Sequence, residues 1–159
     1  MSIDPIQLTE DLHRWEAAWD SRLVRWVSVN RDEQPDFTRM IEHTTSLLRL
    51  VVNLIKDPHL VETDRQKLFE VALYVLNADD RIPESQLGVV GLVDDAIFMA
   101  GTLNDMVGLY SPQIRINWIG EGEILDIIEH IYENRDSYLA YMPSKPESDR
   151  EADEDESSV

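Results

Sequence analysis

The amino-acid sequence predicts an all-α fold, a single-domain bundle of five or six helices with a disordered acidic C-terminal tail. Apolar residues recur at every third or fourth position in successive segments, which is the period of amphipathic helices. Breaks rich in proline, glycine and aspartate separate these segments. The chain has 159 residues, 43% of them apolar, which suffices for one core of ordinary size. We therefore expect a helical domain over residues 1–143 and a solvated tail over residues 144–159.

The first helix is expected to begin at Asp4, a capping residue, followed by Pro5 at the first helical position. Apolar side chains then recur at helical spacing, at Leu8, Leu12, Trp15, Trp19, Leu23 and Trp26. Tryptophans on such a face predict core anchors rather than a ligand platform.

The second helix is expected to start at Pro35 and to stop at Asp57 and Pro58. Its last turns are apolar on more than one side, which predicts a central position in the bundle. Thr63 and Gln66 have the spacing of a capping box, so a third helix is expected from Thr63.

The fourth helix is expected from about Leu92 to a turn at Ser111 and Pro112. A short apolar piece, residues 114–119, follows this turn. The last helix is expected from Glu123 to about Leu139.

The net charge of −18, from 32 acidic and 14 basic residues, is the main compositional anomaly. So acidic a chain should repel nucleic-acid phosphates and anionic membranes, which excludes both as direct partners. Three interpretations stay open: a basic protein partner, mimicry of DNA charge, or adaptation to salt in a halophilic source. The first residues have no basic head with an apolar run, and residues 87–99 are too short to span a bilayer, so a cytoplasmic protein is expected.

Residues 74–96 read YVLNADDRIPESQLGVVGLVDDA. This stretch resembles the YkvA-like domain family of unknown function, which consists of small helical domains. The motif residues that carry the resemblance are Tyr74, Asp80, Ile82, Pro83, Gly91, Asp94 and Asp95. The sequence departs from the family at Ala78, where proline is usual, and at Asp79 and Arg81, where apolar residues are usual.

Carboxylates gather around this motif, at Asp79, Asp80, Glu84, Asp94 and Asp95. One interpretation is a Ca²⁺ or Mg²⁺ site at Asp80, Asp94 and Asp95, because hard cations take oxygen ligands. The interpretation we favour is structural: Asp80 caps loop amides, while Asp94 and Asp95 complement the positive end of a helix. No EF-hand pattern is present, and no cofactor other than a divalent cation is expected.

Other catalytic chemistry has little support in the sequence, and no catalytic residue is assigned. The chain has no cysteine, which excludes thiolate zinc sites and thiol nucleophiles. Glu10 and His13 match half of a di-iron motif, but His43, His59 and His130 have no acid three residues earlier. Phosphate-loop and dinucleotide fingerprints are also absent from the sequence.

The function predicted is that of a protein-interaction or accessory module with a carboxylate-rich structural corner. Its alternatives are a metal-dependent enzyme using Asp80, Asp94 and Asp95, and an acidic mimic of DNA charge. An interaction module needs an exposed apolar patch. The candidates near helix ends are Trp26, Trp118, and Leu109 with Tyr110. The identity of the protein partner and the oligomeric state stay open.

Overall fold

The computed structural model describes residues 3–30, 35–76 and 88–140, which form six helices and contain no strand. The helices are α1 (Pro5–Asn30), α2 (Pro35–Ile55), α3 (Glu62–Leu76), α4 (Gly88–Asn117), α5 (Ile124–Glu133) and α6 (Arg135–Ala140). The predicted all-α fold is therefore confirmed. The predicted tail, residues 144–159, lies outside the described residues. None of the described helices has the length and apolarity needed to span a membrane.

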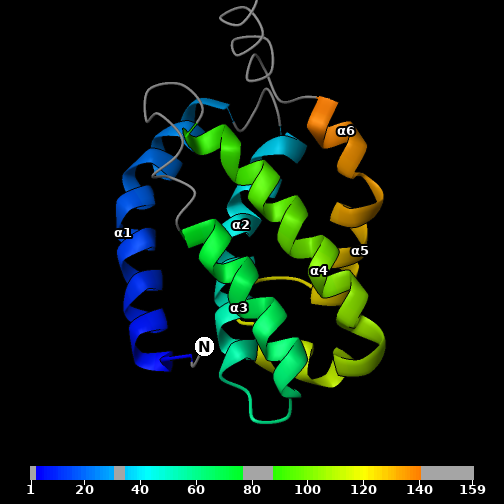
Figure 1. The fold of residues 1–159 in the computed structure, drawn as a ribbon. Coiled ribbons are helices and arrows are strands. Elements are labelled where there is room, and N and C mark those ends of the chain that lie inside the picture. Colours follow the sequence, from blue (N-terminus) through cyan, green and yellow to red (C-terminus); the bar gives the residue numbers. More distant parts are fainter. Residues whose placement is uncertain (1–2, 31–34, 77–87, 141–159) are drawn as a thin grey trace, which may run out of the picture.

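Helix α2 lies in the middle of the bundle (Figure 1). It packs against α1, α3 and α4, and its interface with α4 is the most extensive one between described helices. Helix α4 also packs against α5, so α1 and α5 lie at opposite edges of the molecule. Helices α1, α3 and α5 begin at the end of the bundle where α2 and α4 finish.

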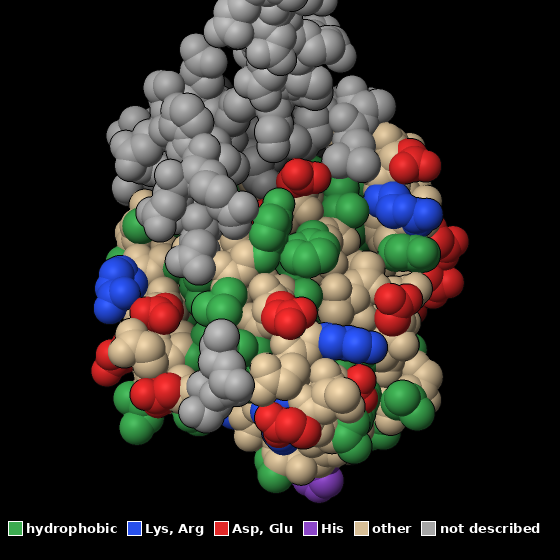
Figure 2. All heavy atoms as spheres, viewed as in Figure 1, with side chains coloured by type: hydrophobic (Ala, Val, Ile, Leu, Met, Phe, Trp, Pro, Cys, Tyr) green, Lys and Arg blue, Asp and Glu red, His purple; other side chains and the backbone are tan. Residues whose placement is uncertain are grey.

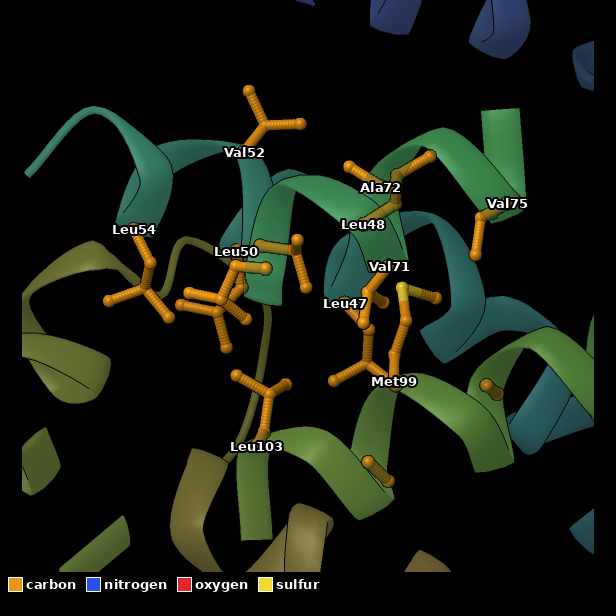
Figure 3. Packing of buried hydrophobic residues seen from close by; sticks show 14 of the residues in the cluster. Leu47, Leu48, Leu50, Val52, Leu54, Val71, Ala72, Val75, Met99 and Leu103 are labelled. Atoms are coloured by element: carbon orange, nitrogen blue, oxygen red, sulfur yellow. The ribbon is translucent and has the colours of Figure 1, made fainter. Parts of the chain in front are cut away.

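The core is built around α2, as its apolar pattern predicted. Side chains from α2, α3 and α4 interdigitate there (Figure 3). Seven apolar residues of α2 have no exposed surface: Ile41, Leu47, Leu48, Leu50, Val51, Val52 and Leu54. Burying each of these side chains stabilises the fold by roughly 1.5–3 kcal/mol.

Helix α1 begins as predicted, because Asp4 Oδ1 accepts hydrogen bonds from the amides of Ile6 (3.0 Å) and Gln7 (3.3 Å). Trp15 and Trp19 are 5% and 4% exposed, which confirms them as core residues. The side chains of Leu23 and Trp26, predicted on the same face, lie outside the described set.

Helix α2 ends at Ile55, before Asp57 and Pro58, as predicted. Helix α3 begins at Glu62, one residue before the predicted start. The Gln66 side chain donates to Glu62 Oε1 (3.2 Å), and Thr63 lies inside the helix instead of at the predicted capping position. Tyr110 of α4 also contacts the start of α3, through Asp64 and the Val61 amide.

Helix α4 starts four residues before the prediction and continues past Pro112. In place of the predicted turn at Ser111 and Pro112, the structure has a kink in α4 at Tyr110, where φ is −126° and ψ is 20°. The Tyr110 hydroxyl donates to Asp64 Oδ2 (2.7 Å) and accepts the Val61 amide (3.2 Å). Pro112 follows the kink at the start of a new helical segment, where its missing amide hydrogen costs little. The kink therefore fastens α4 to the start of α3.

The predicted last helix is divided into α5 and α6. Asn134 separates them, with φ of −104° and ψ of 13°, and its Nδ2 donates to the His130 carbonyl (2.8 Å). An asparagine side chain that bonds the preceding turn competes with the helical ladder. The prediction of one continuous last helix, from Glu123 to about Leu139, is therefore wrong.

Candidate functional site

The carboxylate corner predicted from the sequence is only partly described. Asp80, Ile82 and Pro83 of the motif, together with Asp79 and Glu84, lie outside the described residues. Asp95 is 6% exposed and Asp94 is half-buried in α4. The first turn of α4 holds no acidic residue, so the predicted pairing of these aspartates with its positive end is wrong.

The metal interpretation of the corner remains a prediction. Within the ranges that the structure describes, no three histidine or carboxylate side chains lie close enough to hold a metal ion. Gly91 lies within α4, and Tyr74 lies near the end of α3. Tyr74 is 43% exposed and packs edge-on against Phe98, with ring centroids 4.9 Å apart.

A pocket of about 260 Å³ lies between α2 and the α5–α6 segment. We call it the histidine pocket; its walls are Arg39, Met40, His43, Glu123, Asp126, Ile127, His130, Ile131 and Tyr138. Met40, Ile131 and Tyr138 are buried, so they supply an apolar floor. The charged residues Arg39, Glu123 and Asp126 are exposed and therefore form the rim.

His130 is held in place through both ring nitrogens. Its Nε2 lies 3.0 Å from the Tyr138 hydroxyl, and its Nδ1 lies 3.3 Å from Asn134 Nδ2. An amide nitrogen can only donate, so Nδ1 is the acceptor in its contact with Asn134. The imidazole is thus a fixed part of the wall and links α5 to α6.

His43 faces His130 from α2, since both line the pocket. Burial is the main cause that lowers the pKa of His43, and the nearby charges of Arg39 and His130 lower it further. Glu42 acts in the opposite direction without cancelling them. At neutral pH the His43 ring is therefore uncharged, which suits an apolar occupant.

Three carboxylates lead away from the pocket along α5. Asp126 lies on the rim, and Glu129 and Glu133 follow at spacings of three and four residues, which places all three on one helix face. We call these three residues the acidic strip. A hydrogen bond with Glu133 and its negative charge raise the pKa of Glu129, and Asp126 adds to this. Figure 2 shows acidic side chains gathered at the edge where α5 and α6 lie.

Only part of the predicted apolar patch is exposed to solvent. Leu109 is 76% exposed, but its neighbour Tyr110 is 8% exposed because its ring packs into the core at the kink. Trp118 is half-buried, and its indole nitrogen donates to the Gly122 carbonyl (3.1 Å). The side chain of Trp26 lies outside the described set.

The pocket is not predicted from the sequence, in which His43 and His130 are candidates for catalytic groups only. The signal that could have indicated the pocket is their position: each follows an apolar residue, Met40 or Ile127, by three positions. Such histidines lie at the margin of a buried helix face. The sequence of either helix alone does not show that these two margins lie against each other in the fold.

No family model, curated protein or solved structure matches this chain.

Proposed function

We propose that this chain is a protein-interaction module and that the histidine pocket is its docking site. The observation that carries the proposal is the size and lining of this pocket. Its volume of about 260 Å³ is below the roughly 300–1,000 Å³ of small-molecule and cofactor sites. An apolar floor of this size suits a single side chain, and side chains inserted into such pockets dominate binding energy at protein interfaces.

The state of the two histidines favours binding over catalysis. Both ring nitrogens of His130 are engaged by Tyr138 and Asn134, which hold this ring in place as part of the pocket wall. Burial keeps His43 neutral, so a partner side chain meets no buried charge there. The alternatives, a metal-dependent enzyme and a DNA-charge mimic, rely on Asp80 and on the overall acidity respectively.

The test is selection of binders from a displayed library of random peptides of about 16 residues, long enough for a helix of about 24 Å. Selected peptides are then titrated against two matched variants, Ile127→Phe and Ile119→Phe. Ile127 lines the pocket, whereas Ile119 is 63% exposed and is not one of its lining residues. The same substitution therefore fills the pocket in one variant and leaves it open in the other.

We expect Ile127→Phe to weaken binding about tenfold or more, since a lost anchor costs about 2 kcal/mol. Ile119→Phe should change affinity less than about twofold. Backbone amide shifts on binding should also gather on α2 and α5, which tests the site in the unaltered protein. Peptides whose affinity is the same for both variants, or a library that yields no binder, would refute the proposed function.

A further inference from the structure

We infer that the partner segment is a basic helix, which inserts one apolar side chain into the histidine pocket and carries lysine or arginine one and two turns further along, over the acidic strip. The inference rests on the proposed function and adds the chemistry of the partner. A helix that docks in this manner contacts its binding site through side chains three, four or seven residues apart, which lie on one face of the helix.

The first support is that no described residue forms an ion pair with the acidic strip. None of the ion pairs formed by described residues includes Asp126, Glu129 or Glu133. The neighbouring Glu123 differs, because it accepts a hydrogen bond from Arg115 Nε at 3.0 Å. The strip therefore holds three carboxylates that form no ion pair within the described part of the chain.

The second support is the closeness of the strip residues to one another. Asp126, Glu129 and Glu133 lie one turn apart on the same face of α5, so their negative charges repel one another, and the pKa of Glu129 is raised accordingly. A bound cation would relieve this repulsion, which gives a basic partner an advantage over a neutral one. The net charge of −18 acts in the same direction by attracting basic partners over longer distances.

The third support is the placement of charge around the pocket. Asp126 is on its rim, and Glu133 lies seven residues further along α5, or roughly 10 Å along the helix axis. The cation of the rim, Arg39, is on α2, across the pocket from the strip. A basic segment is therefore repelled on the α2 side and attracted on the α5 side, which orients it along α5.

The experiment uses the peptides selected from the random library, resynthesised with every lysine and arginine replaced by glutamine or with the apolar anchor replaced by alanine. They are titrated by calorimetry, at constant ionic strength, against the unaltered protein and two double variants. Glu129→Gln/Glu133→Gln removes charge from the strip. Glu10→Gln/Glu70→Gln removes equal charge from exposed sites on α1 and α3.

We expect the strip variant to weaken binding of the original peptides about fivefold, as two exposed charge pairs would. The control variant should change it less than about twofold, and replacing the basic residues with glutamine should abolish this difference. Equal losses in both variants would show that only net charge matters and would overturn the inference. Glutamine-substituted peptides that bind as tightly as the originals, yet still lose affinity to Ile127→Phe, would overturn it while leaving the proposed function intact.

Discussion

Arg65 Nε donates a hydrogen bond of 2.8 Å to the carbonyl of Ile55, the last residue of α2. Its Nη2 donates to the carbonyls of Asp57 (2.7 Å) and Leu60 (3.1 Å). A side chain of α3 thereby satisfies carbonyls that the end of α2 would otherwise leave without partners. This contact fastens the α2–α3 connection to α3, and no glycine occurs in that connection.

Replacing Arg65 with methionine should lower the free energy of unfolding by about 1–3 kcal/mol, because several partly buried carbonyls lose their donor. Arg65→Lys should recover only part of this, since one ammonium group cannot reach all three carbonyls. Urea denaturation measures both. The matched control is Arg14→Met, whose side chain is 71% exposed and pairs with Asp11 within one helix, so it should cost less than about 0.5 kcal/mol. Equal costs at the two arginines would contradict the capping role.

Replacing Trp15 or Trp19 with alanine should cost about 3–5 kcal/mol, the usual range for a buried tryptophan. Both are at most 5% exposed and belong to the core. Denaturant unfolding of each variant tests this, with His13→Ala on the exposed face of α1 as the control. A neutral Trp19→Ala would instead mean that the aromatic face of α1 is solvent-facing.

His43 should make the fold less stable in mild acid. Its pKa in the folded protein is below the ordinary value of 6.5, so the unfolded chain binds more protons as the pH falls through 6.5. The free energy of unfolding therefore decreases between pH 6.5 and the lowered pKa, and His43 has no effect at higher pH. The groups around it are Arg39 and Glu42 on α2, Glu123 before α5, Asp126 and His130 on α5, and Tyr138 on α6.

The measurement is urea denaturation of the unaltered protein and His43→Gln at about pH 7.5 and about pH 5.5. The variant should lose less stability on acidification. Glu129 acts in the opposite direction, because a carboxyl group whose pKa is raised on folding gains stability as the pH falls. This contribution is common to both proteins and cancels in their difference. An identical pH dependence for the two proteins would argue against a desolvated His43.

Asp80→Asn should destabilise the protein by about 1–2 kcal/mol, the usual cost of a lost cap, if the carboxylate corner is structural. Added Ca²⁺ or Mg²⁺ should then leave the melting temperature unchanged. The test is a thermal melt of both proteins with each ion, at constant ionic strength so that screening of the −18 charge is the same throughout. A saturable stabilisation that Asp80→Asn abolishes would instead support the metal-dependent enzyme.

Periodicity and capping residues were sufficient to predict the start of α1 at Asp4, the end of α2 at Ile55 and the burial of Trp15 and Trp19. These features depend on residues within a turn or two of one another, so a single chain segment contains the information. The central position of α2 was predictable for the same reason, since a helix that is apolar on several sides must be enclosed.

The features that were missed depend on contacts between distant segments. Tyr110 bonds Asp64 and converts a predicted turn into a kink, while Arg65 caps α2 from the next helix. The histidine pocket likewise needs His43 and His130, which come from different helices. Local sequence determines which face of each helix is apolar, but the packing of the whole bundle selects which faces meet, because that selection depends on the summed fit of all the side chains in the core.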